Sequence, residues 1–422
     1  MSPGRVIPPR MRELGRAQRL GSLVLLGVAV MGQLIALGVF IARGADGSVL
    51  EHLGIGWLYF AGFHGAPLEV DPATAGVVVS TSVTVALLLP TLAAAWLSFA
   101  AGRTAARDAV GPVPWRIAVG ASIAVPYAVA SFLVSLAVIV HLELVVTDNL
   151  FGGPVDVTVD PVALLVRTFA IALVPAVTGA LAAVRGPDLH AVGRLHAAIA
   201  GGARAFGLAL LFAFVGLLVN AGADPSAARG YFELISEPSP TATAIIVGHH
   251  VLVLPNQSLW VLVPAMGGAD ELRFAETEQT IVSYGASVRE IGVGVPTGGA
   301  GAPAVTTQPL PRWYLLFLLV PGLATFLGGA RAAEISGSLR GALALGASAG
   351  LVFGGLVVAG AALSTLAWRV TLAAGEGPSV TAGPDLGQAA VLGLAWGIVG
   401  GLVGAWWRSS VRSSRPRGSP ER

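Results

Sequence analysis

Eight stretches of this 422-residue chain are long and apolar enough to cross a lipid bilayer, and they constrain the fold more than any other feature. A helix needs about 20 residues, at about 1.5 Å each, to cross the hydrocarbon core. Because a bilayer offers no partner for exposed backbone amides, such spans are helical. The runs lie near residues 20–42, 74–101, 117–141, 162–184, 203–221, 313–333, 341–372 and 389–407. The sequence therefore predicts an all-α, polytopic bundle of transmembrane helices.

The composition supports contact with a bilayer and excludes several kinds of chemistry. Hydrophobic residues make up 55% of the chain and charged residues only 11%, unlike a soluble domain. There is no Cys, so disulfides, thiolate catalysis and Cys-ligated metals are excluded. No phosphate-binding glycine loop or basic-aromatic surface for nucleic acid occurs. We therefore expect an integral membrane protein with no cofactor and no nucleic-acid partner.

Arginine residues are distributed unevenly among the connections, and this predicts the topology. Five precede the first apolar run, and three follow each of the second and fourth runs. The connection 142–161 has no arginine and four acidic residues. Because cytoplasmic loops retain positive charge, the basic segment 1–19 is expected on the cytoplasmic side of the plasma membrane. The arginine-rich tail 408–422 is expected to be disordered, cytoplasmic and attracted to anionic lipid.

The segment 241–266 is apolar but interrupted by polar residues and proline. If it crosses, three arginines of the later connections lie inside and seven outside; if it enters and returns on the outer side, the count inverts. A re-entrant segment is therefore favoured, with two short helical arms meeting at Pro255 and with Asn256 bonding the freed backbone groups. The alternative is a continuous, proline-kinked helix of about 39 Å, which could cross.

A second short segment suggests an internal repeat. Residues 48–70 have an apolar core of about 15 residues, too short to cross, and lie on the same outer side. The chain can be read as two membrane units, 20–203 and 204–407, each with a span, an outer re-entrant or interfacial segment and three more spans. Residues 88–107 and 319–334 share a Pro, small residues and an inner Arg. Both units would enter in the same direction, as two tandem parallel repeats.

Polar residues in 241–266 form the candidate site, and none of them is expected to be catalytic. The two adjacent histidines point about 100° apart on a helix and cannot both face one small ligand set. We therefore predict no metal, but a wet cavity or interface. "GASAG" around Ser348 matches a nucleophile elbow but lies in a Gly/Ala-rich span, without the strand-to-helix turn that this chemistry needs. The candidate residues are His249, His250, Pro255, Asn256 and Trp260.

Glycines four residues apart mark the last two spans. Small residues at this spacing let helix backbones approach closely. The pattern indicates either an interface with a second copy or a partner, or packing within the chain. The residues concerned are Gly350, Gly354, Gly397, Gly400, Gly401 and Gly404.

The connection 267–312 is the largest extramembrane piece and is expected on the outer side. Its first part, "DELRFAETEQTIVSYGASVREIGV", is compatible with a short helix and a strand. Its second part is rich in Gly, Pro and Thr and is expected to be flexible. A lid or a partner-binding loop would fit this position.

Several stretches resemble the actinobacterial PerM-like family of multi-pass membrane proteins. They are "WLYFAGFHGAPLEV" (57–70), "LLLPTLAAAWLSFAAGRTAAR" (87–107), "LPNQSLWVLVPAMGG" (254–268) and "PLPRWYLLFLLVPGLATFLGG" (309–329). The resemblance implies a non-enzymatic role, through contacts with membrane proteins of the division or envelope machinery, and no catalytic residues. The alternative is a transporter or channel for a neutral or lipid-like molecule, because transporter sites are often built at discontinuous helices.

Overall fold

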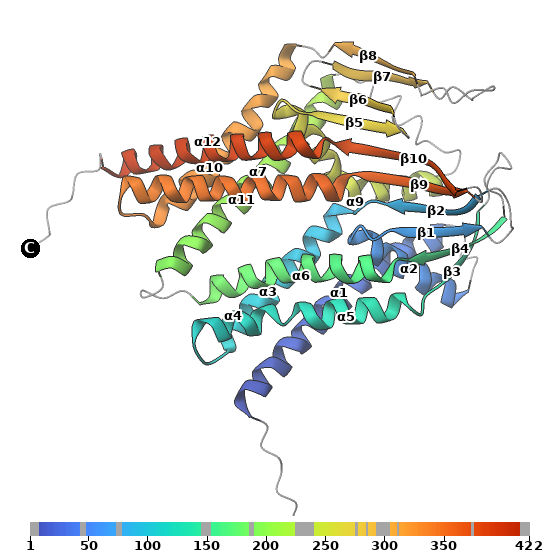
Figure 1. Cartoon of the computed structure of the whole chain (residues 1–422), viewed down its shortest axis with the longest axis horizontal. Helices are drawn as coiled ribbons and strands as arrows, with labels where there is room; N and C mark the ends of the chain where they lie inside the picture. Colours follow the sequence, from blue (N-terminus) through green and yellow to red (C-terminus); the bar gives the residue numbers. More distant parts are fainter. Residues whose placement is uncertain are drawn as a thin grey trace, which may run out of the picture. The chain divides into compact units, whose positions relative to one another are not determined.

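The computed structural model describes residues 8–42, 48–72, 78–144, 153–184, 190–223, 240–274, 277–283, 286–292, 304–309, 312–372 and 375–413 (Figure 1). The chain divides into two compact units. Unit 1 comprises Met1–Asp188, Gly230–Val253 and Leu366–Val380, and unit 2 comprises Leu189–Arg229, Leu254–Thr365 and Thr381–Arg422. Each unit contains long helices and antiparallel strands.

Unit 1 is built from six helices of the first half of the chain and a sheet. The helices are α1 (Pro9–Ala42), α2 (Val49–Phe63), α3 (Leu88–Asp108), α4 (Val113–Ala121), α5 (Ala124–Ser135) and α6 (Pro161–Ala183). The strands are β1 (Leu68–Pro72), β2 (Val78–Thr84), β3 (Val140–Leu144), β4 (Gly153–Val159) and β9 (Leu366–Leu372). Their order is β3-β4-β1-β2-β9, and each neighbouring pair is antiparallel. The strand β9 therefore joins the first-half hairpins from far along the chain.

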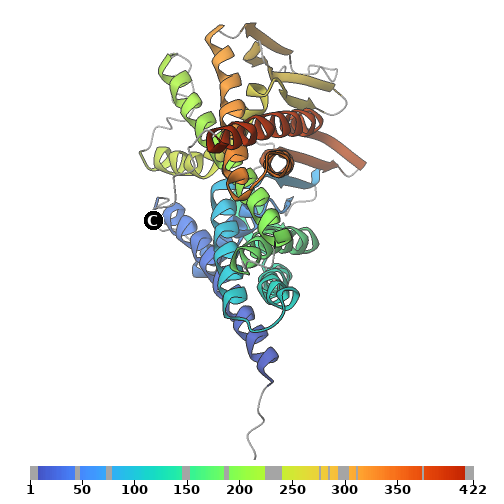
Figure 2. The same ribbon diagram turned by 90° about the vertical axis from the view of Figure 1, so that its left-hand side faces the viewer.

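Unit 2 contains most of the second half of the chain. Its helices are α7 (His190–Ala223), α10 (Leu319–Ala332), α11 (Leu339–Ser364) and α12 (Leu386–Ser413), with short 3-10 helices η1 (Arg312–Leu318) and η2 (Ala333–Ile335). The strands β5 (Ala269–Phe274), β6 (Thr277–Ser283), β7 (Ala286–Gly292) and β8 (Ala304–Pro309) form an antiparallel meander, seen in Figures 1 and 2. Two elements continue from one unit into the other: α9 (Pro240–Ala265) and β10 (Gly375–Pro384).

Seven helices among the described residues are long and apolar enough to cross a membrane. The protein is thus a mostly helical, multi-pass membrane protein, as the sequence predicted. The seven candidate spans are Pro9–Ile41, Val113–Ser135, Pro161–Ala183, Ala191–Val219, Leu315–Ile335, Leu339–Ser364 and Leu386–Arg412.

Three predicted spans include residues that form strands. The run 74–101 contains β2, and α3 begins only at Leu88, so this run is not among the seven. The run 117–141 ends in β3, and the run 341–372 ends in β9. Valine- and threonine-rich strands adjoin the apolar helices directly, and hydropathy alone does not separate the two.

The all-α prediction is corrected by these strands and by the connection 267–312. A short helix and a strand were considered for its first part; the helix is wrong, and the described residues after Gly268 form the strands β5 to β8 and the start of η1. Expected flexibility in the Gly/Pro/Thr-rich part is wrong for Ala304–Pro309, which is strand β8. Residues 294–303 and 310–311 of that part lie outside the described residues, as does the tail after residue 413. The first residues of the tail, 408–413, were expected to be disordered but form the end of helix α12. Threonine, valine and isoleucine residues in β6, β7 and β8 favour strands, because β-branched residues suit a pleated surface.

The two halves of the chain have the same succession of elements. In the first half, α1 and α2 precede a hairpin, α3 and α4–α5 precede a second hairpin, and α6 follows. In the second half, α7 and α9 precede the strands β5 to β8, α10 and α11 precede the hairpin β9–β10, and α12 follows. Among the described residues, the helices of the two halves thus follow one another in the order of the predicted repeat, with strands added between them, and the repeat itself stays a prediction.

The helix ends before the first strands have matching geometry in the two halves. Gly65 after α2 has a φ of +66°, and Gly267 after α9 has a φ of +99°, which a glycine adopts without the steric cost of a Cβ atom. The amide after each glycine donates a hydrogen bond back to the helix. Ala66 N–H donates to the Ala61 carbonyl oxygen at 3.1 Å, and Gly268 N–H donates to the Val263 carbonyl oxygen at 3.0 Å. Both ends are thus Schellman-type caps.

Each of these capped turns between a helix and the first strand, called a corner below, is linked by an aspartate to the last helix of its half. The amide of Asp160, before α6, donates to the Pro67 oxygen at 3.2 Å, and the amide of Asp385, before α12, donates to the Ala269 oxygen at 3.0 Å. Both aspartate side chains also accept hydrogen bonds from first-turn amides of the helix that follows. The sequence signal for both is an Asp directly before an apolar run, a usual N-cap.

Candidate functional site

The five candidate residues all lie on α9, which is continuous from Pro240 to Ala265 with Pro255 inside it. The expected pair of short arms meeting at Pro255 is therefore not what the structure has. A single proline removes one amide donor, and the helix continues past it. Whether α9 crosses the membrane, as the alternative required, stays a prediction.

The structure does not bring these five residues into one site. In unit 1, His249 Nε2 lies 2.5 Å from the Tyr59 hydroxyl of α2. In unit 2, Asn256 is buried and the Trp260 indole N–H donates to the Ser364 oxygen, at the end of α11, at 3.3 Å. The adjacent His250 is partly exposed. In the described part of the chain, no three His, Asp or Glu side chains are placed to hold a metal ion.

The glycines of the last two spans lie where α11 packs on α12 in unit 2. A Cβ atom at Gly350 would overlap the backbone of Gly397, and a Cβ at Gly397 would overlap that of Gly350. Gly401 faces Gly346 in the same way, and Gly354 faces Gly393 and Leu394. Gly400 and Gly404 instead face Thr325 and Phe326 of α10. Backbones are in direct contact at these crossings, which leaves no room for a side chain.

A buried histidine that the sequence reasoning missed lies at the corner of unit 1. His64 follows α2 and is fully buried, with Nδ1 2.7 Å from the Phe60 oxygen and Nε2 2.7 Å from the Tyr127 hydroxyl. A carbonyl oxygen only accepts, so Nδ1 carries the proton and Nε2 accepts from the tyrosine. Burial lowers the pKa of His64 to about 4, so the ring is neutral at pH 7. The pair therefore holds α2 against α5 as neutral groups.

Replacing Tyr127 with Phe is expected to lower the stability of unit 1. The change leaves the buried His64 Nε2 without a donor, which costs about 1–3 kcal/mol. The apparent melting temperature of the purified protein in detergent measures the effect. Tyr59→Phe removes a hydroxyl that hydrogen-bonds the partly buried His249 ring, and this variant is expected to lower the melting temperature less. Equal melting temperatures for Tyr127→Phe and the unmodified chain would contradict the prediction.

A buried carboxyl group lies at the corresponding corner of unit 2. Asp270, in β5, is 1% exposed, and its Oδ1 atom is buried without a hydrogen-bond partner among the residues that the structure describes. Burial, together with the neighbouring Glu271, raises the pKa of Asp270 to about 8. The Gln388 amide donates to Asp385 at 2.7 Å and lowers the pKa of that carboxyl. The raised pKa keeps Asp270 mostly protonated at neutral pH, whereas the lowered pKa of Asp385 favours its carboxylate form.

Comparisons with known proteins do not identify the chain. No protein-family model, curated protein or solved structure matches it. Its own residues, and the local geometry of each unit, are therefore the basis for a functional assignment.

Proposed function

We propose that this chain is a non-enzymatic integral membrane protein of the cell envelope, which acts through protein–protein contacts in cell division or envelope maintenance. The observation that supports this most directly is the ordered sheet of unit 1, which lies in the connections between membrane-crossing helices. Both termini would be cytoplasmic and the strands outside, as the arginine distribution predicts.

The edge of this sheet offers a defined surface for a partner. Strand β3 is the first strand of the sheet and has β4 on one side. Its other side carries backbone N–H and C=O groups that an extended segment can pair with. The side chains of Ile139 and His141 are well exposed along this edge. The partner we propose is an extended segment of a membrane-anchored division or envelope protein.

The resemblance to the PerM-like family supports the same role. The matching order of elements in the two halves supports a second part of the proposal, an internal repeat. Because both halves have the same order of elements and the same capped corners, we infer that they are tandem parallel repeats. A repeated unit would present hairpins of the same kind twice along one chain.

Site-specific photo-crosslinking in the native membrane tests the proposal. A photoreactive residue replaces Ile139, and tagged membrane-anchored division and envelope proteins are co-expressed one at a time. We expect a discrete adduct with at least one of them. The matched control is Leu133 on α5, which is 58% exposed and in a candidate span, so it is expected to face lipid and to give no adduct. Adducts from both positions alike, or from neither, would reject the proposal.

A transporter or channel for a neutral or lipid-like molecule is the second candidate. It is favoured by Asp270, whose pKa of about 8 allows a change of charge near neutral pH, as in proton-linked sites. The two functions predict different results for Asp270→Asn. A scaffold would still crosslink its partner through position 139, while a transporter that uses this proton would lose transport in proteoliposomes.

A further inference from the structure

A pocket of about 510 Å³ lies at one end of the helices of unit 2. It is bounded by the connection between α10 and α11 and by the last turns of α12. Its lining includes Ser336, Gly337, Arg408, Ser409, Ser410 and Arg412. Hydroxyl groups and guanidinium groups thus face the same space.

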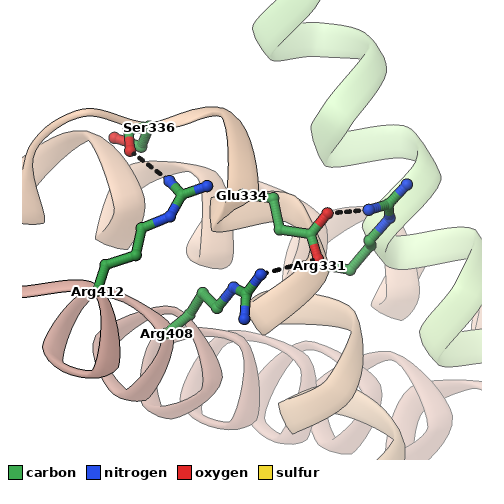
Figure 3. A network of polar contacts seen from close by, with 5 residues as sticks. All are labelled: Arg331, Glu334, Ser336, Arg408 and Arg412. Carbon is green, nitrogen blue, oxygen red and sulfur yellow. Dashed lines mark hydrogen bonds and ion pairs between the residues drawn. The ribbon is translucent and has the colours of Figure 1, made fainter. Parts of the chain in front are cut away.

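The arginines come from two elements and share one carboxylate. Figure 3 shows Arg408 and Arg412 reaching from α12 toward the α10–α11 connection. Glu334 pairs with Arg331 through Oε2 and lies 3.6 Å from Arg408 through Oε1. Arg412 donates to the backbone carbonyl oxygen of Ser336 at 3.2 Å. Two arginines therefore flank the Glu334 carboxylate and Arg412 lies nearby without a carboxylate, so the group of four side chains has a net charge of +2.

Several donors at this pocket have no acceptor among the described residues. Nε of Arg408 is buried and makes no hydrogen bond, and Arg412 makes a single bond although its guanidinium has five N–H groups. The 26-residue helix α11 begins beside the same space: Ser338 Oγ accepts from its Gly341 amide at 3.2 Å, while the amides of Leu339 and Arg340 have no acceptor within the helix. Such donors and a positive surplus suit an anion with several oxygens.

The surrounding apolar residues indicate where this anion comes from. Trp406 and Trp407 on α12 are 55% and 45% exposed, and Ile335 and Leu339 are also well exposed beside the pocket. Exposed tryptophans at the end of an apolar span are typical of the level of the lipid headgroups. The pocket is thus at the height where a phospholipid phosphate lies, with apolar side chains next to it for the acyl chains.

We propose that this pocket binds the phosphate group of an anionic phospholipid, held by Arg408 and Arg412 and by the hydroxyl groups of the α10–α11 connection. The arginine distribution assigns this end of the helices to the cytoplasm, so the lipid belongs to the inner leaflet. The site lies at the basic ends of α10 and α12, away from the strands, and it does not depend on the partner-binding role.

Lipid binding to the purified full-length protein tests this site. Binding of phosphatidylglycerol is measured by native mass spectrometry and by the shift in melting temperature in detergent, with phosphatidylcholine and inorganic phosphate as separate arms. We expect Arg412→Gln to weaken phosphatidylglycerol binding about tenfold, since one charged hydrogen-bonding group is lost. Arg412 is exposed and bonds only one backbone oxygen, so the lipid-free melting temperature should stay unchanged.

Arg340→Gln is the matched control, because Arg340 is an exposed arginine in the first turn of α11 that does not line the pocket. Its phosphatidylglycerol affinity should stay near that of the unmodified chain. If inorganic phosphate raises the melting temperature as much as phosphatidylglycerol does, the ligand is a soluble anion and the proposal of a lipid ligand is wrong. Equal losses in both variants, or no loss in Arg412→Gln, would show that the pocket is not the site.

Discussion

Gly397→Leu is expected to leave no folded, monodisperse protein after extraction from the membrane. Gly397 contacts the backbone of Gly350 directly, where α12 crosses α11, and even a Cβ atom there would overlap it. A leucine side chain would force the two helices apart along their whole contact. Overpacking a close contact typically costs about 1–3 kcal/mol, and more when the obstacle is backbone that cannot rotate away. In a membrane, where packing drives helix association, that loss has no hydrophobic compensation.

Gel filtration of a fluorescent fusion in mild detergent measures this effect, with the melting temperature as a second readout. Gly355→Leu provides the control, because Gly355 is exposed on the same helix, α11, and nothing lies within 4 Å of its added Cβ. Gly397→Ala should fall between the two. A sharp, unshifted peak for Gly397→Leu would mean that α11 and α12 do not pack as described.

Asp270→Asn is expected to stabilise the protein in alkaline solution. The pKa of Asp270 is about 8 when folded, against an ordinary value of 3.8. Between about pH 4 and 8 the folded chain keeps a proton that the unfolded chain has released, so the free energy of unfolding falls as pH rises through this window. A fully linked proton changes it by roughly 1.4 kcal/mol per pH unit. Asparagine does not ionise, so the variant escapes this loss.

Melting temperatures measured across the pH range give the test. Asp270→Asn should melt well above the unmodified chain above about pH 8, and the gap should narrow as pH falls toward 4. Asp71→Asn, at an exposed position in β1, is expected to show no such gap. Parallel curves for Asp270→Asn and the unmodified chain would mean that Asp270 is ionised and solvated.

Local patterns explain which parts of the fold were predictable. Apolar runs identified the membrane helices because length and hydropathy depend on nearby residues only, as in α6 and α12. Strand β9 was missed because its pairing partner is distant in the sequence: Trp368 pairs with Val83 of β2. A valine-rich run such as 78–84 looks the same as the start of a span until its partner strand is known.

The candidate site was less predictable than the fold. The polar residues of α9 stood out in the sequence because they interrupt an apolar run, but the structure separates them between two units. His64 and Asp270 gave no such signal, since burial decides their chemistry and burial depends on the tertiary fold. The one local signal was the shared pattern of a glycine-terminated helix, a strand and a later Asp before an apolar helix. A comparison of the sequence of residues 62–70 with that of residues 264–272 shows the glycine at the same position in both, with the strand beginning shortly after it.

The pairing of β2 with β9 has a consequence for how the protein is made. Thr84 and Leu366, where these strands end and begin, are separated by nearly 300 residues of intervening chain. At typical synthesis rates of about 5–20 residues per second, the free edge of β2 waits roughly 15 to 60 s for its neighbour. During that time it is open to pairing with other extended segments of the chain that reach the outer side. A factor that shields this edge would raise the yield of correctly assembled protein.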